Sequence, residues 1–369
     1  MSAPVFDLHA HPSMKTYLFK KKIHKSHKPG GAFNPFSMRV DLPKLRAGGV
    51  NGLLSAIYLP EKGLLEDCFP LKMMYTFAPR RLKRLFSGNP FDETVMLIEH
   101  FENVVSSAPA VSGVKLEIAK SRAELDKVIA DGDIALVHSI EGGHSLNSDP
   151  GNVERFFDRG VASITLAHFY ENGVAPPVDA VPSHMKKMGC FRKPKNLSLG
   201  LTDTGRQVVD EMMRLGMLID LTHCTPKARE DVFTRVGTSK PLLMTHCGSF
   251  SLRPDPMNPT DAEAKKIAAG GGLIGVIFMT HWLTADHKPW DILRYVVVTI
   301  RRLVGVVGED AVGFGSDFDG LTDPPDDLVD PSGIPLLARE LEAAGLSTGK
   351  VEKVLGGNAM RVLKAGWGR

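Results

Sequence analysis

The chain has 369 residues, a length that suits one large enzyme domain or two modest ones. Hydrophobic residues make up 43% and charged residues 24%, a balance that excludes a disordered or low-complexity protein. The formal net charge of +3, from 45 basic and 42 acidic residues, argues against a nucleic-acid-binding protein, because such proteins carry a larger basic excess.

Short apolar runs rich in Val, Ile, Leu and Ala recur along the chain and predict β-strands. Most of them lack the period-2 alternation of a half-exposed strand, so we expect strands buried on both faces, as in a parallel sheet. The nine candidates are 5–11, 50–59, 113–119, 134–141, 161–168, 217–223, 241–246, 273–279 and 311–318. Amphipathic stretches at 203–216 and 261–271 predict helices between strands, with Asp203 as a cap of the first and Gly216 at its end.

Strands that alternate with helices indicate βα units. An open doubly wound sheet commonly has a glycine-rich phosphate loop after its first strand, whereas this first strand ends in HAHPS. We therefore predict an α/β fold of the (β/α)8 TIM-barrel type, with 113–119 as the peripheral ninth strand. No repeat or linker divides the chain, which favours a single domain over residues 1–369 with excursions at about 60–105 and 170–200.

The cysteines and the apolar runs indicate the cellular compartment of the protein. Four cysteines show no close CxxC spacing, so we expect no disulfide framework and a reducing compartment. The apolar runs fall short of the roughly 18–20 residues that cross a bilayer. The N-terminus also lacks the basic and apolar regions of a secretory signal. These features predict a cytoplasmic protein with no membrane partner.

Two basic stretches fall in the predicted loop after the first strand and in the first excursion. A solvated basic surface is the simpler interpretation, and an anionic partner or substrate is the alternative. The residues are Lys20, Lys21, Lys22, Lys25 and Lys28 in the first stretch, and Arg80, Arg81, Lys83 and Arg84 in the second.

Nearly every buried run ends in a histidine or a carboxylate. Because all strand C-termini of a βα barrel open onto one face, we expect these side chains to converge. The residues are His9, His11, Glu141, His168, His223, His246 and Asp317.

Imidazoles and carboxylates in this arrangement are typical of a zinc site. His9 and His11 are two residues apart on a strand and share a face, so both can bind one ion. His223 and His246 supply a second pair of nitrogen ligands, and the two oxygens of Glu141 can bridge two ions.

The neighbouring cysteines have a simpler role. Cys224 and Cys247 directly follow two of these histidines, and strand alternation turns them away from the metal. We expect both to be packing residues.

The sequence resembles the amidohydrolase superfamily and, within it, the membrane (renal) dipeptidase family of zinc peptidases. The similarity lies in blocks that run in family order across almost the whole chain, at 137–146, 164–168, 199–223, 311–320 and 351–363. Together these blocks are far more specific than an isolated HxH motif.

The resemblance implies a division of the ligands between two divalent ions, with Zn²⁺ as the expected metal. His9, His11 and Asp317 are expected on one ion, His223 and His246 on the other, and Glu141 as the bridge. His168 matches the family histidine that contacts the substrate carbonyl or the oxyanion.

The sequence departs from the family pattern at two places. The dipeptidases typically have His-x-Asp at the first strand, where this chain has His9-Ala-His11. The family also places an Arg-Asn pair after the second zinc-binding histidine, where this chain has Met257-Asn258. Arg253 lies four residues earlier, so Arg253 and Asn258 are the expected substrate-binding residues besides His168.

The predicted function is hydrolysis of a small amide, a dipeptide above all, by attack of a hydroxide that bridges two zinc ions. Asp317 is expected to move the proton and His168 to stabilise the oxyanion, with Glu141 as the third catalytic residue. Alternatives are another amidohydrolase activity on an ester, lactone or non-peptide amide, and a non-catalytic barrel that acts as a binding protein. No nucleic-acid partner is expected, and the oligomeric state stays open, a homodimer included.

Overall fold

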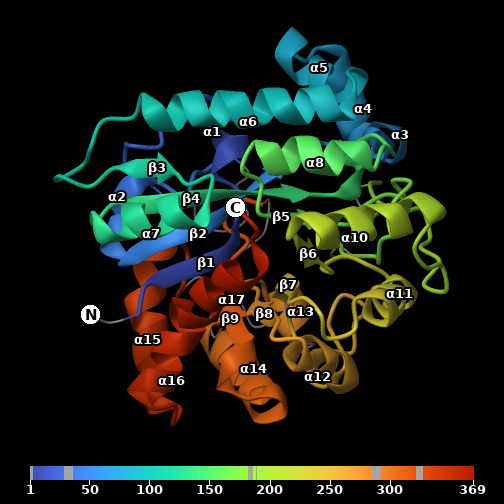
Figure 1. Cartoon of the computed structure of the whole chain (residues 1–369). Helices are drawn as coiled ribbons and strands as arrows, with labels where there is room; N and C mark the ends of the chain where they lie inside the picture. Colours follow the sequence, from blue (N-terminus) through green and yellow to red (C-terminus); the bar gives the residue numbers. More distant parts are fainter. Residues whose placement is uncertain (1–2, 29–35, 182–185, 188, 285–291, 321–326) are drawn as a thin grey trace.

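The strands of this computed structural model, which describes residues 3–28, 36–181, 186–187, 189–284, 292–320 and 327–369, form a single parallel sheet surrounded by helices (Figure 1). The path through the sheet is β1-β2-β4-β5-β6-β7-β8-β9, and β3 pairs with β4 off this path. The strands are β1 (Val5–Ala10), β2 (Val50–Tyr58), β3 (Leu116–Ile118), β4 (Ile134–Glu141), β5 (Ser163–Thr165), β6 (Leu218–Asp220), β7 (Leu242–Cys247), β8 (Leu273–Val276) and β9 (Val312–Phe314).

Backbone contacts between the two end strands bring the sheet close to a closed barrel. Ala10 forms a parallel bridge with Phe318, and the His11 N–H donates to the Phe318 carbonyl at 2.8 Å. The Asp317 N–H donates to the His9 carbonyl at 2.9 Å. The predicted (β/α)8 fold and the peripheral place of the 113–119 strand are therefore confirmed.

Helices follow most strands, as the alternating sequence pattern predicts. They are α1 (Pro12–Phe19), α2 (Leu42–Ala47), α3 (Lys62–Asp67), α4 (Phe69–Thr76), α5 (Arg80–Ser87), α6 (Pro90–Ser106), α7 (Arg122–Ala130), α8 (Gly151–Asp158), α10 (Asp203–Leu215), α11 (Pro226–Val236), α12 (Asp261–Ala269), α13 (Thr280–Leu283), α14 (Ile292–Val307), α15 (Ile334–Ala343), α16 (Thr348–Glu352) and α17 (Asn358–Gly366). Within the described part of the chain, none of them combines the length and the apolar character needed to span a bilayer.

One predicted helix cap is shifted by a residue. The N-cap of α10 is Thr202, whose side chain accepts a hydrogen bond from the Gly205 N–H at 2.8 Å, and the predicted cap Asp203 is the first helical residue. Asp203 instead pairs with Arg206 within the first turn. The predicted end is correct, because Gly216 adopts the left-handed conformation (φ 74°) that terminates the helix.

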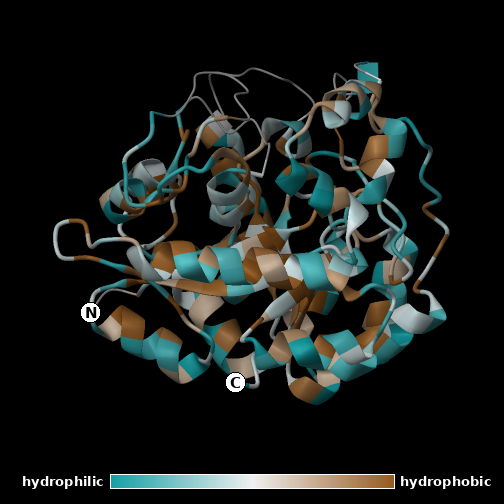
Figure 2. Cartoon of the chain, turned by 90° about the horizontal axis from the view of Figure 1, so that it is seen from above, coloured by the Kyte–Doolittle hydropathy of each residue, from teal (hydrophilic) through white to brown (hydrophobic). Residues whose placement is uncertain are grey.

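The central strands are mostly hydrophobic, whereas the surrounding helices carry both hydrophobic and hydrophilic residues (Figure 2). The larger hydrophobic cluster joins the strands to the surrounding helices. A second cluster joins strand residues such as Leu8 and Leu243 to Trp367, which is 1% exposed just after α17. Cys224 and Cys247 are free thiols in the larger cluster, in agreement with the expected packing role.

The two predicted excursions are joined by a disulfide between Cys68 and Cys190. Cys68 lies between α3 and α4, and around it Tyr170 donates a hydrogen bond to Asp67 at 3.2 Å and packs with Phe191. The expectation of no disulfide is thus corrected for this pair. The partners lie 122 residues apart, so no local spacing signals the bond, which depends on the folding of one excursion against the other.

Candidate metal centre

The six predicted ligands lie together at the carboxyl ends of the strands, and each is at most 7% exposed. They come from five different strands, so only the closure of the barrel brings them into contact. His9 lies in β1 and His11 directly after it, Glu141 ends β4, His246 lies in β7, and His223 and Asp317 lie three residues beyond β6 and β9.

His223 and Asp317 have left-handed backbone conformations, with φ of 67° and 56°. This conformation turns the chain out of the β-ladder, which explains why both strands end before the residues that the sequence pattern includes in them. Glycine is required beside Asp317 on packing grounds. A Cβ at Gly315 would lie 1.9 Å from the Thr245 carbonyl oxygen, and one at Gly320 would lie 2.0 Å from Asp317 Oδ1.

Glu141 lies at the centre of the group, and its two carboxylate oxygens contact different histidines. Its Oε1 is 3.1 Å from His9 Nε2, 3.5 Å from His246 Nε2 and 3.6 Å from His223 Nε2. Its Oε2 is 3.5 Å from His11 Nε2. A carboxylate within reach of all four histidines can contact two ions at once.

The histidines form two pairs around this carboxylate. The Nε2 atoms of His9 and His11 are 3.0 Å apart, and so are those of His223 and His246. Asp317 belongs to the first pair, because its Oδ1 lies 3.2 Å from His11 Nε2 and 4.0 Å from His9 Nε2. Asp317 thus lies beside the two histidines with which the family resemblance groups it, while ligand atoms of His9, His246 and Asp220 also lie within 4.8 Å of one another.

Burial and neighbouring charges shift the pKa values of His246, Glu141 and Asp317 in different directions. Burial, and then the charges of His9 and His223, hold the pKa of His246 well below its usual value. Burial opposes the ionisation of Glu141, yet the surrounding histidines keep its pKa well below the usual range. Burial, assisted by the charge of Glu141 and opposed by His9, raises the pKa of Asp317 well above the usual range. A buried carboxyl that is costly to ionise, among neutral imidazoles, fits a divalent cation that would offset its charge.

Asp220 and Thr245 support His9 and His246 on the side away from Glu141, through the Nδ1 atoms of the two imidazoles. Asp220 accepts hydrogen bonds from the Thr245 N–H at 3.1 Å and from its hydroxyl at 2.6 Å. Thr245 Oγ1 in turn lies 3.0 Å from His246 Nδ1 and 3.5 Å from His9 Nδ1. Such contacts fix the orientation of the imidazoles, as supporting residues do in metal sites.

His168 faces the same carboxylate from a different side, and its Nε2 is 3.5 Å from Glu141 Oε2. Its Nδ1 is 3.1 Å from Oε2 of Glu61. The sequence analysis predicts no role for Glu61. Glu61 is fixed in turn, because it accepts a hydrogen bond from Tyr58 Oη at 3.1 Å and from the N–H groups of Phe169 and Tyr170.

The charges of this group favour a protonated His168. Burial lowers its pKa, but the charges of Glu141 and Glu61 outweigh burial and raise it overall. Burial also opposes ionisation of Glu61, whereas His168 and further hydrogen bonds hold its pKa at about 2. Glu61 lies three residues after the end of β2. It therefore shares the pattern by which the other site residues are predicted, a polar residue at or just after the end of a strand.

A cavity of about 210 Å³ opens above these residues. The polar groups on its wall include His11, Glu141, His168, His223 and Asp317. The remaining wall is almost entirely apolar and comes from α1, from α3 to α5, from the second excursion and from α13. Its residues include Leu18, Leu64, Leu82, Phe86, Phe191 and Trp282.

The two predicted substrate-binding residues of the 247–258 loop do not line this cavity. Arg253 Nε donates to the His281 carbonyl at 3.2 Å. Asn258 is fully buried, accepts from the Gly248 N–H at 2.6 Å and donates to the carbonyls of Arg253 and Trp282. The Asn258 side chain therefore holds the loop together.

A TIM barrel whose strand ends carry buried histidines around a shared carboxylate defines a metal-dependent hydrolase. The membrane dipeptidase family, peptidase family M19, matches residues 1–366, so the chain belongs to this family. The resemblance inferred from the sequence is confirmed, and by its family the chain is a metal-dependent dipeptidase.

Known relatives span most of the chain. A Klebsiella pneumoniae protein named from the pqqA 5′ region is 33% identical over 264 residues, which cover 70% of this chain and 92% of that protein. The dipeptidase ataJ of Aspergillus terreus is 28% identical over 337 residues, which cover 88% of this chain and 76% of that protein. A crystal structure of a metallopeptidase from Rhodobacter sphaeroides, liganded with a phosphinate mimic of the dipeptide L-Ala-D-Ala, has the same fold. It gives a TM-score of 0.79 at 24% identity and covers 100% of both chains.

Proposed function

We propose that this chain hydrolyses the amide bond of a small dipeptide-like substrate at a pair of divalent ions, for which Zn²⁺ is the metal best matched to the ligands. The observation that carries the proposal is the position of Glu141 within reach of both histidine pairs, with Oε1 near His9, His223 and His246 and Oε2 near His11. His9, His11 and Asp317 would hold one ion, His223 and His246 the other, and Glu141 both. Four imidazoles and two carboxylates are a ligand set that suits zinc.

Divalent ions bound here would act as Lewis acids and lower the pKa of bound water. The residues of the chain would supply the proton transfers and the orientation. Asp317, the carboxylate beside His11, would accept the proton of the attacking water and return it to the departing amine. His168, whose protonated form Glu61 favours, would donate a hydrogen bond to the oxygen of the substrate carbonyl as negative charge develops there.

We expect elemental analysis to find two equivalents of divalent metal per chain after incubation with excess zinc, because six ligand side chains exceed what one tetrahedral ion uses. His223→Ala should lower the content to one. His24→Ala removes a histidine remote from the centre and should leave two. A wild-type value that stays at one would exclude the two-ion proposal.

The lining of the cavity supports a second candidate, hydrolysis of an amide or ester that has no free carboxylate. Among the described residues that line the cavity there is no lysine or arginine, although burying an unpaired carboxylate costs several kcal/mol. Met257, at the position of the family arginine, is fully buried in the core. A dipeptide amide or a non-peptide amide would avoid this cost.

The two candidates differ in their response to a C-terminal charge. For a free-acid substrate, kcat/KM on a dipeptide such as Ala-Ala should exceed that on its C-terminal amide, whereas the second candidate requires the reverse order. We expect Arg253→Met to change kcat/KM on both substrates by a similarly small factor, because Arg253 is bonded to the His281 carbonyl away from the cavity. A loss of roughly 2–3 kcal/mol on the free acid alone would instead establish Arg253 as the carboxylate ligand.

A further inference from the structure

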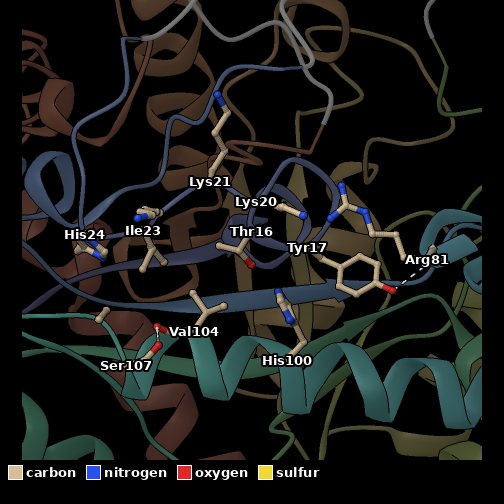
Figure 3. Close-up of a pocket in the computed structure, with 12 residues that line it drawn as sticks. Thr16, Tyr17, Lys20, Lys21, Ile23, His24, Arg81, His100, Val104 and Ser107 are labelled. Carbon is tan, nitrogen blue, oxygen red and sulfur yellow. Dashed lines mark hydrogen bonds between the residues drawn. The ribbon is translucent and has the colours of Figure 1, made fainter. Parts of the chain in front are cut away.

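A second cavity, of about 540 Å³, lies between α1, the segment that follows α1, α5 and α6 (Figure 3). Its described lining residues are all different from those of the metal-centre cavity, so the two spaces are separate. A volume of this size falls in the range of small-molecule sites. We refer to it as the basic cavity.

Both basic stretches of the sequence contribute to the basic cavity. Lys20, Lys21 and Lys22 come from the end of α1 and the segment after it, and Arg81 comes from the first turn of α5. Figure 3 shows the side chains of Lys20 and Arg81 directed toward each other. The lining includes no carboxylate among the described residues, so positive charges meet here without a negative partner.

Several surface cations elsewhere in the described chain are paired. Arg84, in the same helix as Arg81, binds Glu93, and Arg214 binds Glu154 and Glu211. Within the described ranges, Lys20, Lys21 and Lys22 form no ion pair. Like charges that a fold brings together repel one another, and a bound anion would relieve this repulsion.

Arg81 is held in place by uncharged contacts. Its Nη2 donates to the Leu18 carbonyl at 2.9 Å, and the Tyr17 hydroxyl donates to the Arg81 carbonyl at 3.3 Å. These bonds leave other guanidinium N–H groups available in a fixed orientation, which is the arrangement that binds carboxylate or phosphate oxygens well. His100, on the facing helix α6, has a buried Nε2 without a hydrogen-bond partner among the described groups.

The wall between the cations is aliphatic. Val104 and Ala108, both half-buried, lie along the cavity beside the fully buried Ile23. A bare inorganic anion would leave this apolar surface without a partner, whereas a ligand with a hydrocarbon group would cover it.

We propose that the basic cavity binds a small organic anion. Its carboxylate or phosphate lies between Lys20 and Arg81, and its apolar part lies against Val104 and Ala108. This binding is separate from hydrolysis, since the basic cavity shares no described lining residue with the metal centre.

The test is titration calorimetry of the metal-loaded protein with octanoate and with octyl phosphate, which separates the two anionic groups. The variant Lys20→Gln/Lys21→Gln removes two cavity cations. The matched control Lys25→Gln/Lys28→Gln removes the same charge from the same segment at exposed positions outside the lining. We expect at least about tenfold weaker binding of the better octyl ligand in the first variant, as for loss of a charge-assisted contact, and wild-type binding in the control. Unchanged metal content in both variants shows that they are folded.

Two comparison ligands complete the design. Inorganic phosphate lacks the apolar part and 1-octanol lacks the charge, so each should bind at least about tenfold more weakly than octyl phosphate or octanoate. Equal affinity of an octyl anion for wild type and both variants would place it elsewhere, for instance at the metal centre, and would overturn the proposal. Inorganic phosphate that binds as tightly as octyl phosphate would do the same, as would no binding of either octyl anion at millimolar concentration.

Discussion

Asp317→Asn should lower kcat by about 10²–10⁴-fold, with little change in KM. The asparagine keeps an oxygen close to His11 Nε2, where Asp317 Oδ1 lies at 3.2 Å, but it cannot accept the proton from the attacking water. The measurement is steady-state kinetics on the best substrate, with metal content determined in parallel. This separates loss of the base from loss of an ion.

Asp319→Asn is the matched control for this variant. Asp319 is also buried, two residues away, but it accepts hydrogen bonds from the N–H groups of Arg39 and Val40 at 2.9 Å. Its replacement should lower thermal stability and leave kcat within a few-fold of wild type. If Asp317→Asn retains wild-type kcat with full metal content, Asp317 is a ligand only and another group moves the proton.

Glu61→Gln should lower kcat by about 10–100-fold, the usual effect of removing a group that positions a residue of the site, here His168. Glutamine can still accept the hydrogen bonds from Phe169 and Tyr170, so the backbone after β5 keeps its contacts. It lacks the negative charge that helps to raise the pKa of His168. The pKa of His168 therefore falls, and its protonated form is lost at a lower pH than in wild type.

The readout specific to this role is the pH profile of kcat. Its decline on the alkaline side should begin at lower pH in Glu61→Gln than in wild type, because His168 deprotonates earlier. Glu66→Gln changes an exposed glutamate of the same excursion, which pairs with Lys193, and should leave the profile unchanged. A lower kcat with an unshifted profile would mean that Glu61 supports only the structure.

The sequence predicts the barrel and the convergence of its polar strand ends because both depend on local patterns. Runs of apolar residues that end in histidine or carboxylate locate His9, Glu141 and His246 without any knowledge of contacts. Glu61 was missed although it follows β2, because its segment reads as the start of an excursion. The Cys68–Cys190 bond and the proximity of Lys20 to Arg81 depend on how segments that are distant in the sequence fold against one another, and no periodicity encodes this.

The Cys68–Cys190 bond lies at the periphery of the barrel, yet it closes a covalent loop that contains β3, β4 and β5. In the chain-entropy view, such a bond restricts the unfolded chain, and a loop of this length contributes on the order of 4–5 kcal/mol to the free energy of unfolding. The strand that ends in Glu141 and the strand that leads to His168 both lie inside this loop. A bond between two surface excursions thereby makes unfolding more costly for the part of the barrel that carries Glu141.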